Sequence, residues 1–393
     1  MKLPDPPLPS YTFTIYHRDI FEKSNFKNYD SLLESRLARC HARARYLTLA
    51  HESKNGSLGG DMLELVPKST DTYNNGEYVA SFLIGSQMIK NYLLVDTGSD
   101  LLWWQCGPCE ANKCYYQHQP LYNSTASKTF RKVDCDQHGF KCKTDDPHFY
   151  CNLQSFECKY DVEYTDGSSV KGFIADDVIS FVLDNRPIRV MFGCSKDQTG
   201  HFLASFSGVV GLGRDVSRGY SLPSQFGGNL MSMCLPSVLS GKGSVLSFHT
   251  TKFPRATSAK LLPNHVWPSC YYVNLYKIFV NKKEVSVDPS WWNFKPDMTG
   301  GVIVDTGTTL TRFPTDFYII FRTIFRSEVR DIPMFEYPAE PFDTCYANPD
   351  NIELHFPIVK LYFGSVDSSH ELVLAQERVV LKIHGLYCLA FIG

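Results

Sequence analysis

The alternation of apolar and polar residues divides the chain into a short amino-terminal region and a long β-rich region. Residues 11–15 alternate like a strand, and residues 31–47 carry apolar side chains at helical spacing. Ser31 and Glu34 form a capping box at the start of this predicted helix. After Glu77, short runs rich in Val, Ile and Thr are broken by Gly, Pro and Asn. The pattern therefore predicts a mostly β protein preceded by one convincing helix.

One short motif occurs twice, each time at the end of an apolar strand. Residues 92–95 run into Asp96-Thr97-Gly98-Ser99, and residues 301–304 run into Asp305-Thr306-Gly307-Thr308. A single Asp-Thr-Gly means little, because Asp and Gly gather in turns generally. Two copies, each after an apolar strand and each followed by a hydroxyl residue, indicate an internal duplication. The chain should therefore hold two β lobes, each presenting one aspartate.

Two aspartates side by side suit hydrolysis of a peptide bond without a metal or a covalent intermediate. Close carboxylates cannot both ionise easily, so one apparent pKa falls and the other rises, which leaves a base and an acid together in mild acid. Asp96 and Asp305 are the expected catalytic pair. The glycines permit a tight turn, the following hydroxyls can bond the outer carboxylate oxygens, and the threonines can brace the two loops. These supporting residues are Thr97, Gly98, Ser99, Thr306, Gly307 and Thr308.

Several segments resemble the pepsin-like aspartic proteases, peptidase family A1, over the chain from Glu77 to its end. Residues 94–103 resemble the first active-site segment of that family and residues 304–311 the second. Residues 164–168 look like the flap hairpin, and residues 209–213 resemble the strand that passes beneath the first active-site loop. The resemblance implies an all-β, bilobal fold, an endopeptidase acting on peptide or protein substrates, a monomer, and neither cofactor nor metal.

The resemblance also implies roles for particular segments. Tyr164, Asp166 and Gly167 would belong to the flap that closes over substrate. Residues 75–252 would form the amino-terminal lobe with a Cys-rich insertion, and residues 253–393 a carboxyl-terminal lobe.

Thirteen cysteines are present, and seven fall between residues 106 and 158. Such clustering in a loop-rich segment favours disulfides over metal ligands and points to an oxidising compartment. The Cys-rich insertion and the remaining Cys contexts resemble the plant nepenthesin-like branch. The pairs implied by that resemblance are Cys106 with Cys109, Cys114 with Cys194, Cys135 with Cys158, Cys142 with Cys151, and Cys345 with Cys388. A bridge between Cys234 and Cys270 stays open as an alternative.

Three other motif interpretations are weaker. His17-Arg18-Asp19 occurs in the catalytic loop of protein kinases, but no Asp-Phe-Gly and no Gly-rich nucleotide loop accompany it. The run 106–109 is a thioredoxin-type Cys-x-x-Cys without a βαβ unit. His118 and His138 lie near these cysteines, yet no second Cys-x2-Cys completes a zinc site.

The amino-terminal region is expected to be a propeptide and linker, residues 1–74, because residues 15–19 resemble the propeptides of the same branch. The helix is rich in arginine, at Arg36, Arg39, Arg43 and Arg45. The simple interpretation is a solvated basic helix. In the sharper interpretation, the cations lie over an acidic cleft and keep a zymogen closed. Residues 51–76 are rich in Ser, Gly, Asn and Asp, which is typical of a linker suited to cleavage.

Composition sets the remaining expectations. Lys plus Arg number 39 and Asp plus Glu 41, which gives no electrostatic reason to expect nucleic acid as a partner. No apolar run is long enough to span a membrane. The sequons at Asn55 and Asn123 fit a secretory route to the apoplast or the vacuole. Residues 1–7 lack the apolar core of a signal peptide, so we expect the amino terminus to be incomplete.

The carboxyl end departs from the family pattern, which has a further strand beneath the second active-site loop. We therefore expect a truncated second lobe and an open underside at Asp305. An active endopeptidase made as a zymogen is the favoured function. The alternatives are an inactive inhibitor or binding protein on the same scaffold, or a truncated, non-functional product.

Overall fold

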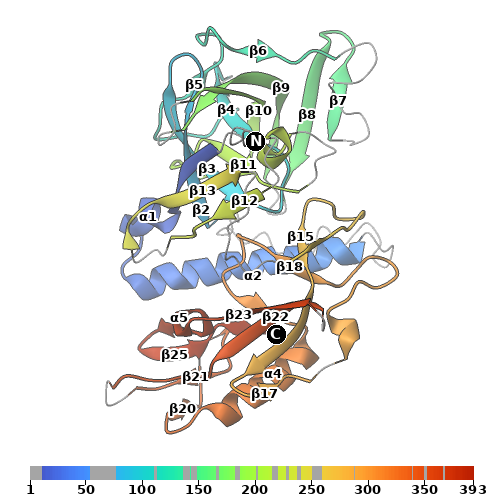
Figure 1. Ribbon diagram of the computed structural model, residues 1–393. Helices are drawn as coiled ribbons and strands as arrows, with labels where there is room; N and C mark the ends of the chain where they lie inside the picture. Colours follow the sequence, from blue (N-terminus) through green and yellow to red (C-terminus); the bar gives the residue numbers. More distant parts are fainter. Residues whose placement is uncertain are drawn as a thin grey trace, which may run out of the picture.

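The computed structural model describes most of the chain in two lobes with a helix between them (Figure 1). The described residues are 11–53, 77–109, 113–135, 142, 148–164, 168–181, 186–200, 202–214, 220–226, 230–236, 240–249, 259–286, 288–338, 340–348, 352–365 and 368–393. The predicted all-β, two-lobed architecture is confirmed. The predicted sequon Asn55 and the flap residues Asp166 and Gly167 lie outside the described residues.

The amino-terminal lobe is built on one 13-stranded sheet with the path β12-β13-β1-β2-β3-β11-β4-β10-β9-β8-β7, with β5 beside β4 and β6 beside β9. The strands of this lobe are β1 (Tyr11–His17), β2 (Tyr78–Ile84), β3 (Ile89–Asp96), β4 (Trp103–Gly107), β5 (Tyr122–Asn123), β6 (Arg131–Lys132), β7 (Phe149–Asn152), β8 (Glu157–Glu163), β9 (Ser169–Ser180), β10 (Ile188–Thr199), β11 (Gly208–Gly211), β12 (Leu230–Met233) and β13 (Ser244–His249). Aromatic residues such as Phe82, Trp104 and Phe192 are fully buried in its core. The Phe-rich strands thus supply the apolar area that holds this lobe together.

The carboxyl-terminal lobe consists of several smaller sheets, among them β17-β16-β22-β23 and β20-β21-β25-β24. Its strands are β14 (Leu261–Leu262), β15 (Tyr271–Val273), β16 (Leu275–Val280), β17 (Lys283–Glu284), β18 (Val302–Val304), β19 (Thr311–Arg312), β20 (Met334–Phe335), β21 (Cys345–Tyr346), β22 (Val359–Ser365), β23 (Ser368–Val373), β24 (Val380–Ile383), β25 (Leu386–Leu389) and β26 (Phe391–Ile392). Helix α4 (Thr315–Glu328) buries Phe317, Phe321 and Phe325, which follow one another at four-residue spacing and so share one face. This aromatic stripe joins the helix to the core of the lobe.

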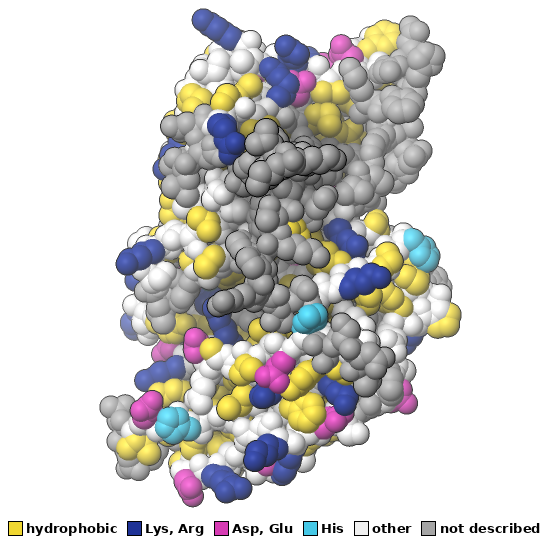
Figure 2. Space-filling model, viewed as in Figure 1, with side chains coloured by type: hydrophobic (Ala, Val, Ile, Leu, Met, Phe, Trp, Pro, Cys, Tyr) yellow, Lys and Arg dark blue, Asp and Glu magenta, His cyan; other side chains and the backbone are white. Residues whose placement is uncertain are grey.

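The short helices are α1 (Asp19–Glu22), α3 (Leu222–Gln225) and α5 (Gln376–Val379), with 3-10 turns η1 (Lys23–Asn25) and η4 (Pro289–Trp291). None of the helices in the described part of the chain combines the length and the apolar character that a membrane crossing requires. On the face shown in Figure 2, Lys and Arg side chains are interspersed with Asp and Glu side chains.

Strand β1, from the predicted propeptide, is an integral part of the first lobe. It pairs with β13 on one side and with β2 on the other, so it joins the β12-β13 hairpin to the rest of the sheet. Phe13 and Ile15 point into the core and are fully buried. The alternation of apolar and polar residues at 11–15 therefore reflects a strand with one face buried in the core.

The long helix α2 (Tyr29–Ser53) lies across the seam between the lobes (Figure 1). Its cap lies three residues earlier than predicted, at Asn28 instead of Ser31. The amide of Ser31 donates to Asn28 Oδ1 at 2.9 Å, and the Asn28 amide donates to Ser31 Oγ at 3.2 Å, which is the reciprocal pattern of a capping box. Glu34 instead reaches His384 of the second lobe, 2.9 Å away.

Four of the five predicted disulfide pairings are wrong. The structure joins Cys106 to Cys194, Cys109 to Cys114, Cys135 to Cys151 and Cys142 to Cys158, where Cys106–Cys109, Cys114–Cys194, Cys135–Cys158 and Cys142–Cys151 were expected. Cys345 is bonded to Cys388, as expected. Cys234 and Cys270 are not bridged to each other.

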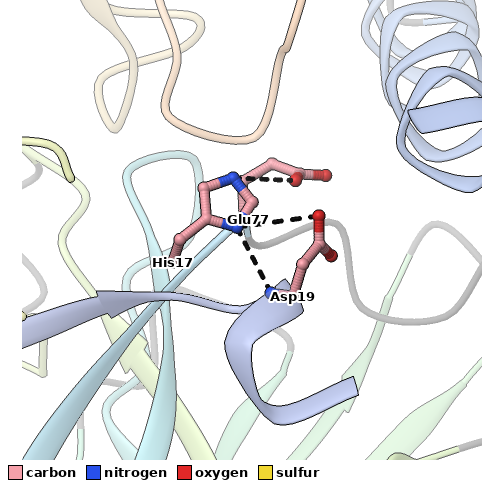
Figure 3. Close-up of side chains that lie close together, drawn as sticks. All are labelled: His17, Asp19 and Glu77. Atoms are coloured by element: carbon pink, nitrogen blue, oxygen red, sulfur yellow. Dashed lines mark hydrogen bonds and ion pairs between the residues drawn. The ribbon is translucent and has the colours of Figure 1, made fainter. Parts of the chain in front are cut away.

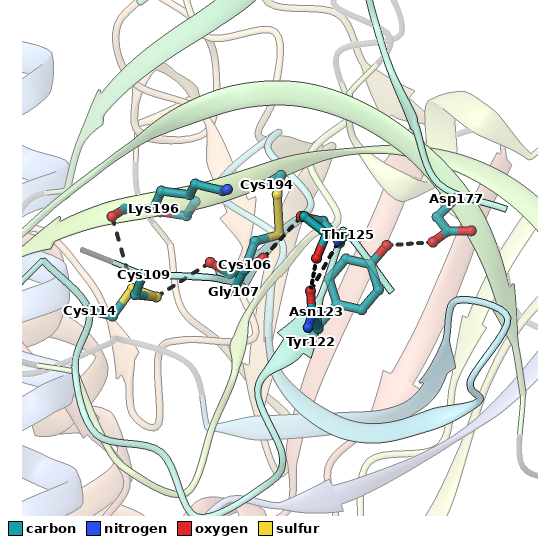
Figure 4. The surroundings of a disulfide bond; sticks show 12 residues. Cys106, Gly107, Cys109, Cys114, Tyr122, Asn123, Thr125, Asp177, Cys194 and Lys196 are labelled. Atoms are coloured by element: carbon teal, nitrogen blue, oxygen red, sulfur yellow. Dashed lines mark hydrogen bonds between the residues drawn. A yellow bond between two sulfur atoms is a disulfide. The ribbon is translucent and has the colours of Figure 1, made fainter. Parts of the chain in front are cut away.

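The physical reason is strand register, which Cys spacing does not reveal. The parallel strands β4 and β10 place Cys194 opposite Trp104, and this brings its Cα within 5.4 Å of Cys106 (Figure 4). In the β7–β8 pair Cys151 lies opposite Cys158, and each of these is bonded to a cysteine of the preceding loop. The eight cysteines form two groups of four, Cys106, Cys109, Cys114 and Cys194, and Cys135, Cys142, Cys151 and Cys158. The predicted pairs have the right group members, but the partners within each group are exchanged.

The two strands that carry the aspartates have different surroundings. Strand β3 lies between β2 and β11, and Val95 is fully buried. Strand β18 pairs with β15, and in the described part of the chain it has no second neighbour. Val304, at the position that matches Val95, is 55% exposed. The side of β18 away from β15 is therefore open in this structure.

Because Val95 is buried and Val304 is exposed, the same Val→Ala substitution should lower stability by different amounts at the two positions. Val95→Ala should lower the free energy of unfolding by about 2 kcal/mol, because it removes buried methyl groups and leaves a cavity. Val304→Ala should change it by less than about 0.5 kcal/mol, because the side chain already faces solvent. Urea unfolding of the two variants beside the unmodified protein measures both values. Equal losses would contradict the difference in burial.

Candidate active site

The two aspartates stand at the inner ends of strands from different lobes. Asp96 ends β3, and β11 runs parallel to that strand with Val210 opposite Val95. The Leu212 amide donates to the carbonyl oxygen of Asp96 at 2.7 Å. Asp305 follows β18 and is joined through it to β15. Each carboxyl group thus projects from a loop that begins at a strand end.

Hydrogen bonds between the two threonines lock the two loops together. Thr97 Oγ1 and Thr306 Oγ1 are 3.2 Å apart, and the Thr306 amide donates to Thr97 Oγ1 at 3.1 Å. Both threonines are buried. The bracing that the sequence predicts is thus present, and it fixes one lobe against the other at the level of the carboxylates.

The glycines bring amides to the carboxylates, as expected. The Gly98 amide donates to Asp96 Oδ1 at 3.0 Å, and the Gly307 amide donates to Asp305 Oδ1 at 3.2 Å. A Cβ atom on Gly98 would lie 2.0 Å from Arg43 Nη2, so only glycine permits the close approach of that guanidinium.

The two hydroxyl residues behave differently. Thr308 Oγ1 donates to Asp305 Oδ2 at 2.7 Å, as predicted. The predicted bond from Ser99 to Asp96 is not formed, and Ser99 Oγ has no hydrogen-bond partner among the described residues. Asp96 Oδ1 accepts instead from the Gly98 amide and from Arg43. The contacts of the Asp96 carboxyl therefore differ from those that the repeated motif suggests.

Arg43 of helix α2 bridges the two aspartates. Its Nη2 donates to Asp96 Oδ1 at 3.3 Å and to Asp305 Oδ1 at 3.2 Å, and its Nε donates to Asp305 Oδ2 at 3.1 Å. The three side chains are 6%, 16% and 7% exposed, respectively, for Arg43, Asp96 and Asp305. One guanidinium nitrogen is thus shared by both carboxylates, which places the two groups face to face.

The electrostatics of the site follow from this bridge. Burial opposes ionisation of Asp305, but Arg43, the Thr308 hydroxyl and the Gly307 amide outweigh it and hold the pKa of this carboxyl below its usual value. Burial also opposes the charge of Arg43, but Asp96 and Asp305 outweigh it and raise the pKa of the guanidinium. The closed site therefore consists of two carboxylates held by one cation.

The predicted flap tyrosine lies beside the first active-site segment. Tyr164 follows β8, and its amide donates to the carbonyl of Ser168 at 2.7 Å, which closes the β8–β9 hairpin. The indole Nε1 of Trp103 donates to the Tyr164 hydroxyl at 2.7 Å. Trp103 is fixed in the strand that follows the Asp96 loop, so the hairpin is tied to that loop.

The comparisons with known proteins agree with this geometry. Residues 78–248 match the family described as Xylanase inhibitor N-terminal, and residues 270–393 match Xylanase inhibitor C-terminal. Aspartic proteinase nepenthesin-2 of Nepenthes gracilis is 31% identical over 322 residues, which cover 80% of this chain and 70% of that protein. Aspartyl protease family protein 2 of Arabidopsis thaliana is 32% identical over 400 residues, covering 98% and 78% of the two chains. The chain belongs to the plant pepsin-like aspartic proteases.

Solved structures with the same fold include proteins of lower sequence identity. The structure described as edgp has a TM-score of 0.61 at 22% identity and covers 80% of this chain and 83% of its own. Conglutin gamma, a basic 7S globulin from lupine seeds, has a TM-score of 0.57 at 19% identity, with 80% and 82% covered. At such identities the likeness shows the fold alone.

Sequence reasoning placed four arginines near the cleft but did not single out Arg43. Arg36 and Arg39 bind Asp19 and Glu77 instead of the dyad, and the side chain of Arg45 lies outside the described residues. The helical repeat was a usable signal, since Arg36, Arg39 and Arg43 share one face at three- and four-residue spacing. Which member of that face meets the dyad depends on the position of the helix along the seam.

Replacing the bridging cation should weaken the closed fold in a pH-dependent way. Arg43→Gln should lower the free energy of unfolding by about 3–5 kcal/mol at neutral pH, because it leaves two buried carboxylates without their partner. Since the pKa of Asp305 is lowered in the folded state, its contribution is present above the ordinary value of 3.8 and is lost as pH falls further. The loss in Arg43→Gln should therefore shrink below pH 3.8, as measured by denaturant unfolding across pH.

The matched control is Lys113→Gln, which breaks an exposed ion pair with Asp197. This substitution should cost less than about 1 kcal/mol at every pH. A deficit in Arg43→Gln that stays constant from neutral pH to acid would show that the bridge is not electrostatic.

Proposed function

We propose that this protein is an aspartic endopeptidase made as a zymogen, with Asp96 and Asp305 as its catalytic residues. The observation that supports this most is the pair of braced Asp-Thr-Gly loops, whose carboxyl groups share one guanidinium nitrogen. No other arrangement in the described part of the chain brings two carboxyl groups from the two lobes onto one atom. Relatives named as aspartic proteinases support the same chemistry.

The proposed chemistry begins once Arg43 has left. Two carboxylates held by the Thr97–Thr306 brace then face each other without a cation, so they retain one proton between them. The ionised carboxyl removes a proton from a bound water while the protonated one donates to the carbonyl oxygen of the substrate. The resulting tetrahedral carbon then loses the amine, to which a proton is returned. These reaction steps need mild acid, because the two carboxyl groups must hold a single proton between them.

The position of Arg43 between the two carboxylates supports the zymogen part of the proposal. Its guanidinium fills the space between the carboxylates in which the water and the scissile carbonyl would lie. Helix α2 also buries Leu33, Leu37 and Cys40 against the second lobe, so the arginine is held by a packed element. The segment that carries it would therefore have to move, or be removed by cleavage within residues 54–76, before substrate can bind.

The setting of the enzyme is proposed from its cysteines and its sequon. Five disulfides suit an oxidising compartment, the cell exterior or the vacuole. Asn123 is exposed at the end of β5, and the Thr125 hydroxyl donates to its side-chain oxygen at 2.8 Å, so this sequon is available for a glycan. Both features fit a secreted glycoprotein.

A binding protein on the protease scaffold is the second candidate, because the matched family is described by xylanase inhibitors. Such a protein has no need for the dyad geometry. The intact turns at Asp96 and Asp305 favour the peptidase.

A peptidase assay decides between the two candidates. After acid treatment the protein should hydrolyse a denatured protein substrate near pH 3–5 and be inhibited by pepstatin, and it should be inactive at neutral pH. Asp96→Asn and Asp305→Asn should each lower kcat by about 10³-fold or more, because the pair acts as one unit. Asp177→Asn tests another buried carboxyl as a control and should not abolish turnover in material that folds.

The outcome that would contradict the peptidase is a folded, acid-treated protein without pepstatin-sensitive activity at any pH. Tight binding of a glycosidase by the same preparation would then support the second candidate.

The flap assignment has its own test. Tyr164→Ala should lower kcat/KM by about ten- to a hundredfold, because the ring that covers substrate is lost, while Tm changes little. Tyr164→Phe removes the hydroxyl that accepts the bond from Trp103 but keeps the ring, so it should have a smaller effect. Unchanged kinetics in Tyr164→Ala would remove the flap role.

A further inference from the structure

The strand that leads into Asp305 has one neighbour, and this neighbour is bonded to the other lobe. Strand β15 pairs with β18 so that Tyr271 lies opposite Val304, the residue directly before Asp305. In the described part of the chain no other strand pairs with β18. The position of the Asp305 loop relative to the first lobe therefore depends on how β15 is held.

The side chain of Tyr271 reaches from the second lobe to the first. Its hydroxyl donates to the carbonyl oxygen of Leu212 at 2.7 Å. Leu212 directly follows β11, and its own amide donates to the carbonyl oxygen of Asp96 at 2.7 Å. One residue of the first lobe is thus bonded both to Asp96 and to the tyrosine beside the strand of Asp305.

The bond between Tyr271 and Leu212 does not depend on pH in the acid range. Burial raises the pKa of the Tyr271 phenol above its ordinary value of 10.0, so the hydroxyl keeps its proton and remains a donor. Its acceptor is a backbone carbonyl, which does not titrate. The bond is therefore present under the acid conditions that the proposed chemistry needs.

The chain just before β15 is bonded to the first lobe as well. The amide of Arg214 donates to the carbonyl oxygen of Ser269 at 2.9 Å, and the Ser269 hydroxyl donates to Asp100 Oδ2. Asp100 belongs to the segment that follows Asp96, and Arg214 to the segment that follows β11. The two segments of the first lobe that surround Asp96 thus both hold the chain that leads into β15.

The brace between the two threonines cannot fix the orientation of the loops alone. Its bonds all join Thr97 and Thr306, so they form one point of attachment, about which one loop can still turn. The bond from Tyr271 to Leu212 is a second point, at the strand beside β18. Two separate points restrict that rotation, and so they limit changes in the distance between the two carboxyl groups.

The contacts of Arg43 do not replace this second point in the proposed open form, because Arg43 has then left. Nor do the buried charges shown in Figure 3, where His17 lies between the carboxyl groups of Asp19 and Glu77. The ion pairs of His17 join β1, α1 and the residue before β2, not β15 or β18. The threonine brace and the bonds from Tyr271 and its neighbours therefore remain to hold the two loops.

We propose that Tyr271 is a positioning residue of the aspartate pair, which fixes β15, and through it the loop of Asp305, against the loop of Asp96. This rests on the proposed peptidase function. Tyr271 acts through Leu212 and Val304 and takes no part in proton transfer. A displacement of about 1 Å in a catalytic group can lower a rate about a hundredfold, so a hydroxyl that only sets position can still control turnover.

The substitution Tyr271→Phe removes the hydroxyl and keeps the ring. In acid-treated protein it should lower kcat by about tenfold and change KM by less than about twofold, because the dyad is misplaced while the surface that binds the peptide is kept. Initial rates on a peptide substrate, measured across pH, give both constants. They are compared over the pH range in which circular dichroism shows the variant to be folded.

The width of the pH profile is a readout that a simple loss of stability does not move. Carboxyl groups that lie farther apart interact less, so their two apparent pKa values approach each other. In Tyr271→Phe the acid limb of kcat/KM should therefore move up and the alkaline limb down, which narrows the profile by about 0.5 pH unit or more.

The matched control is Tyr115→Phe. The Tyr115 hydroxyl also donates to a backbone carbonyl, that of Phe206 at 2.9 Å, but both residues belong to the first lobe. This substitution should leave the width of the profile unchanged and kcat within about twofold. Where Tyr271→Phe does not fold, Ser269→Ala, which breaks the neighbouring bond to Asp100, should narrow the profile by a smaller amount.

Hydrogen exchange tests the same bond without any enzymatic activity. In the full chain, Tyr271→Phe should raise the exchange rate of the amides in residues 302–309 by about fivefold, because β15 loses one bond to the first lobe. Tyr115→Phe should leave the exchange of this segment unchanged. Mass spectrometry of the peptides produced by digestion after exchange measures both variants beside the unmodified protein.

The profile decides where the protein is active, and the exchange decides where it is not. In an active enzyme, a folded Tyr271→Phe with a profile of unchanged width overturns the positioning role and leaves the peptidase, whether or not kcat falls. Equal narrowing in Tyr115→Phe also overturns it. In a chain without activity at any pH, faster exchange in residues 302–309 sinks the peptidase and leaves the tie between the loops, and unchanged exchange sinks both.

Discussion

The repulsion between two carboxylates held face to face is the constraint on which the rest of the structure depends. The Thr97–Thr306 brace forces Asp96 and Asp305 together, and neither group can move away without breaking the contact between the lobes. Something positive must therefore stand between them. In this structure it is the guanidinium of Arg43, and in the proposed open form it is a single shared proton. The same constraint thus accounts for the cation bound in this structure and underlies the acid chemistry proposed for an open form.

Helix α2 holds its arginine by two different kinds of contact. Toward the second lobe it presents Leu33, Leu37 and Cys40, whose burial depends little on pH. Toward the first lobe it presents Arg36 and Arg39, whose partners Asp19 and Glu77 titrate. The helix is thereby attached to one lobe by packing and to the other by charge. The two attachments therefore differ in their physical nature, one apolar and one ionic.

The internal repeat of the sequence does not produce equivalent surroundings for the two aspartates. Strand β3 is enclosed between β2 and β11, and the first loop is bonded from below through Leu212. Strand β18 has β15 on one side, and Val304 faces solvent. The second aspartate compensates locally, since Asp305 accepts bonds from Thr308, Gly307 and Arg43. The more open loop is therefore the one with the larger number of hydrogen bonds to its carboxyl group.

The sequence by itself determined the main elements and the residues of the candidate site. Strand alternation, the apolar runs before each Asp-Thr-Gly and the helical repeat of residues 31–47 are local properties, and local sterics and burial fix them. The tertiary structure decided which distant groups meet. Cysteine spacing could not give the partners of Cys106 or Cys158, because strand register sets them. Nor could the arginine repeat show that Arg39 meets Glu77 while Arg43 meets the dyad, because that depends on how far α2 is shifted along the seam, and the shift is set by packing and ion pairs between residues remote in the chain.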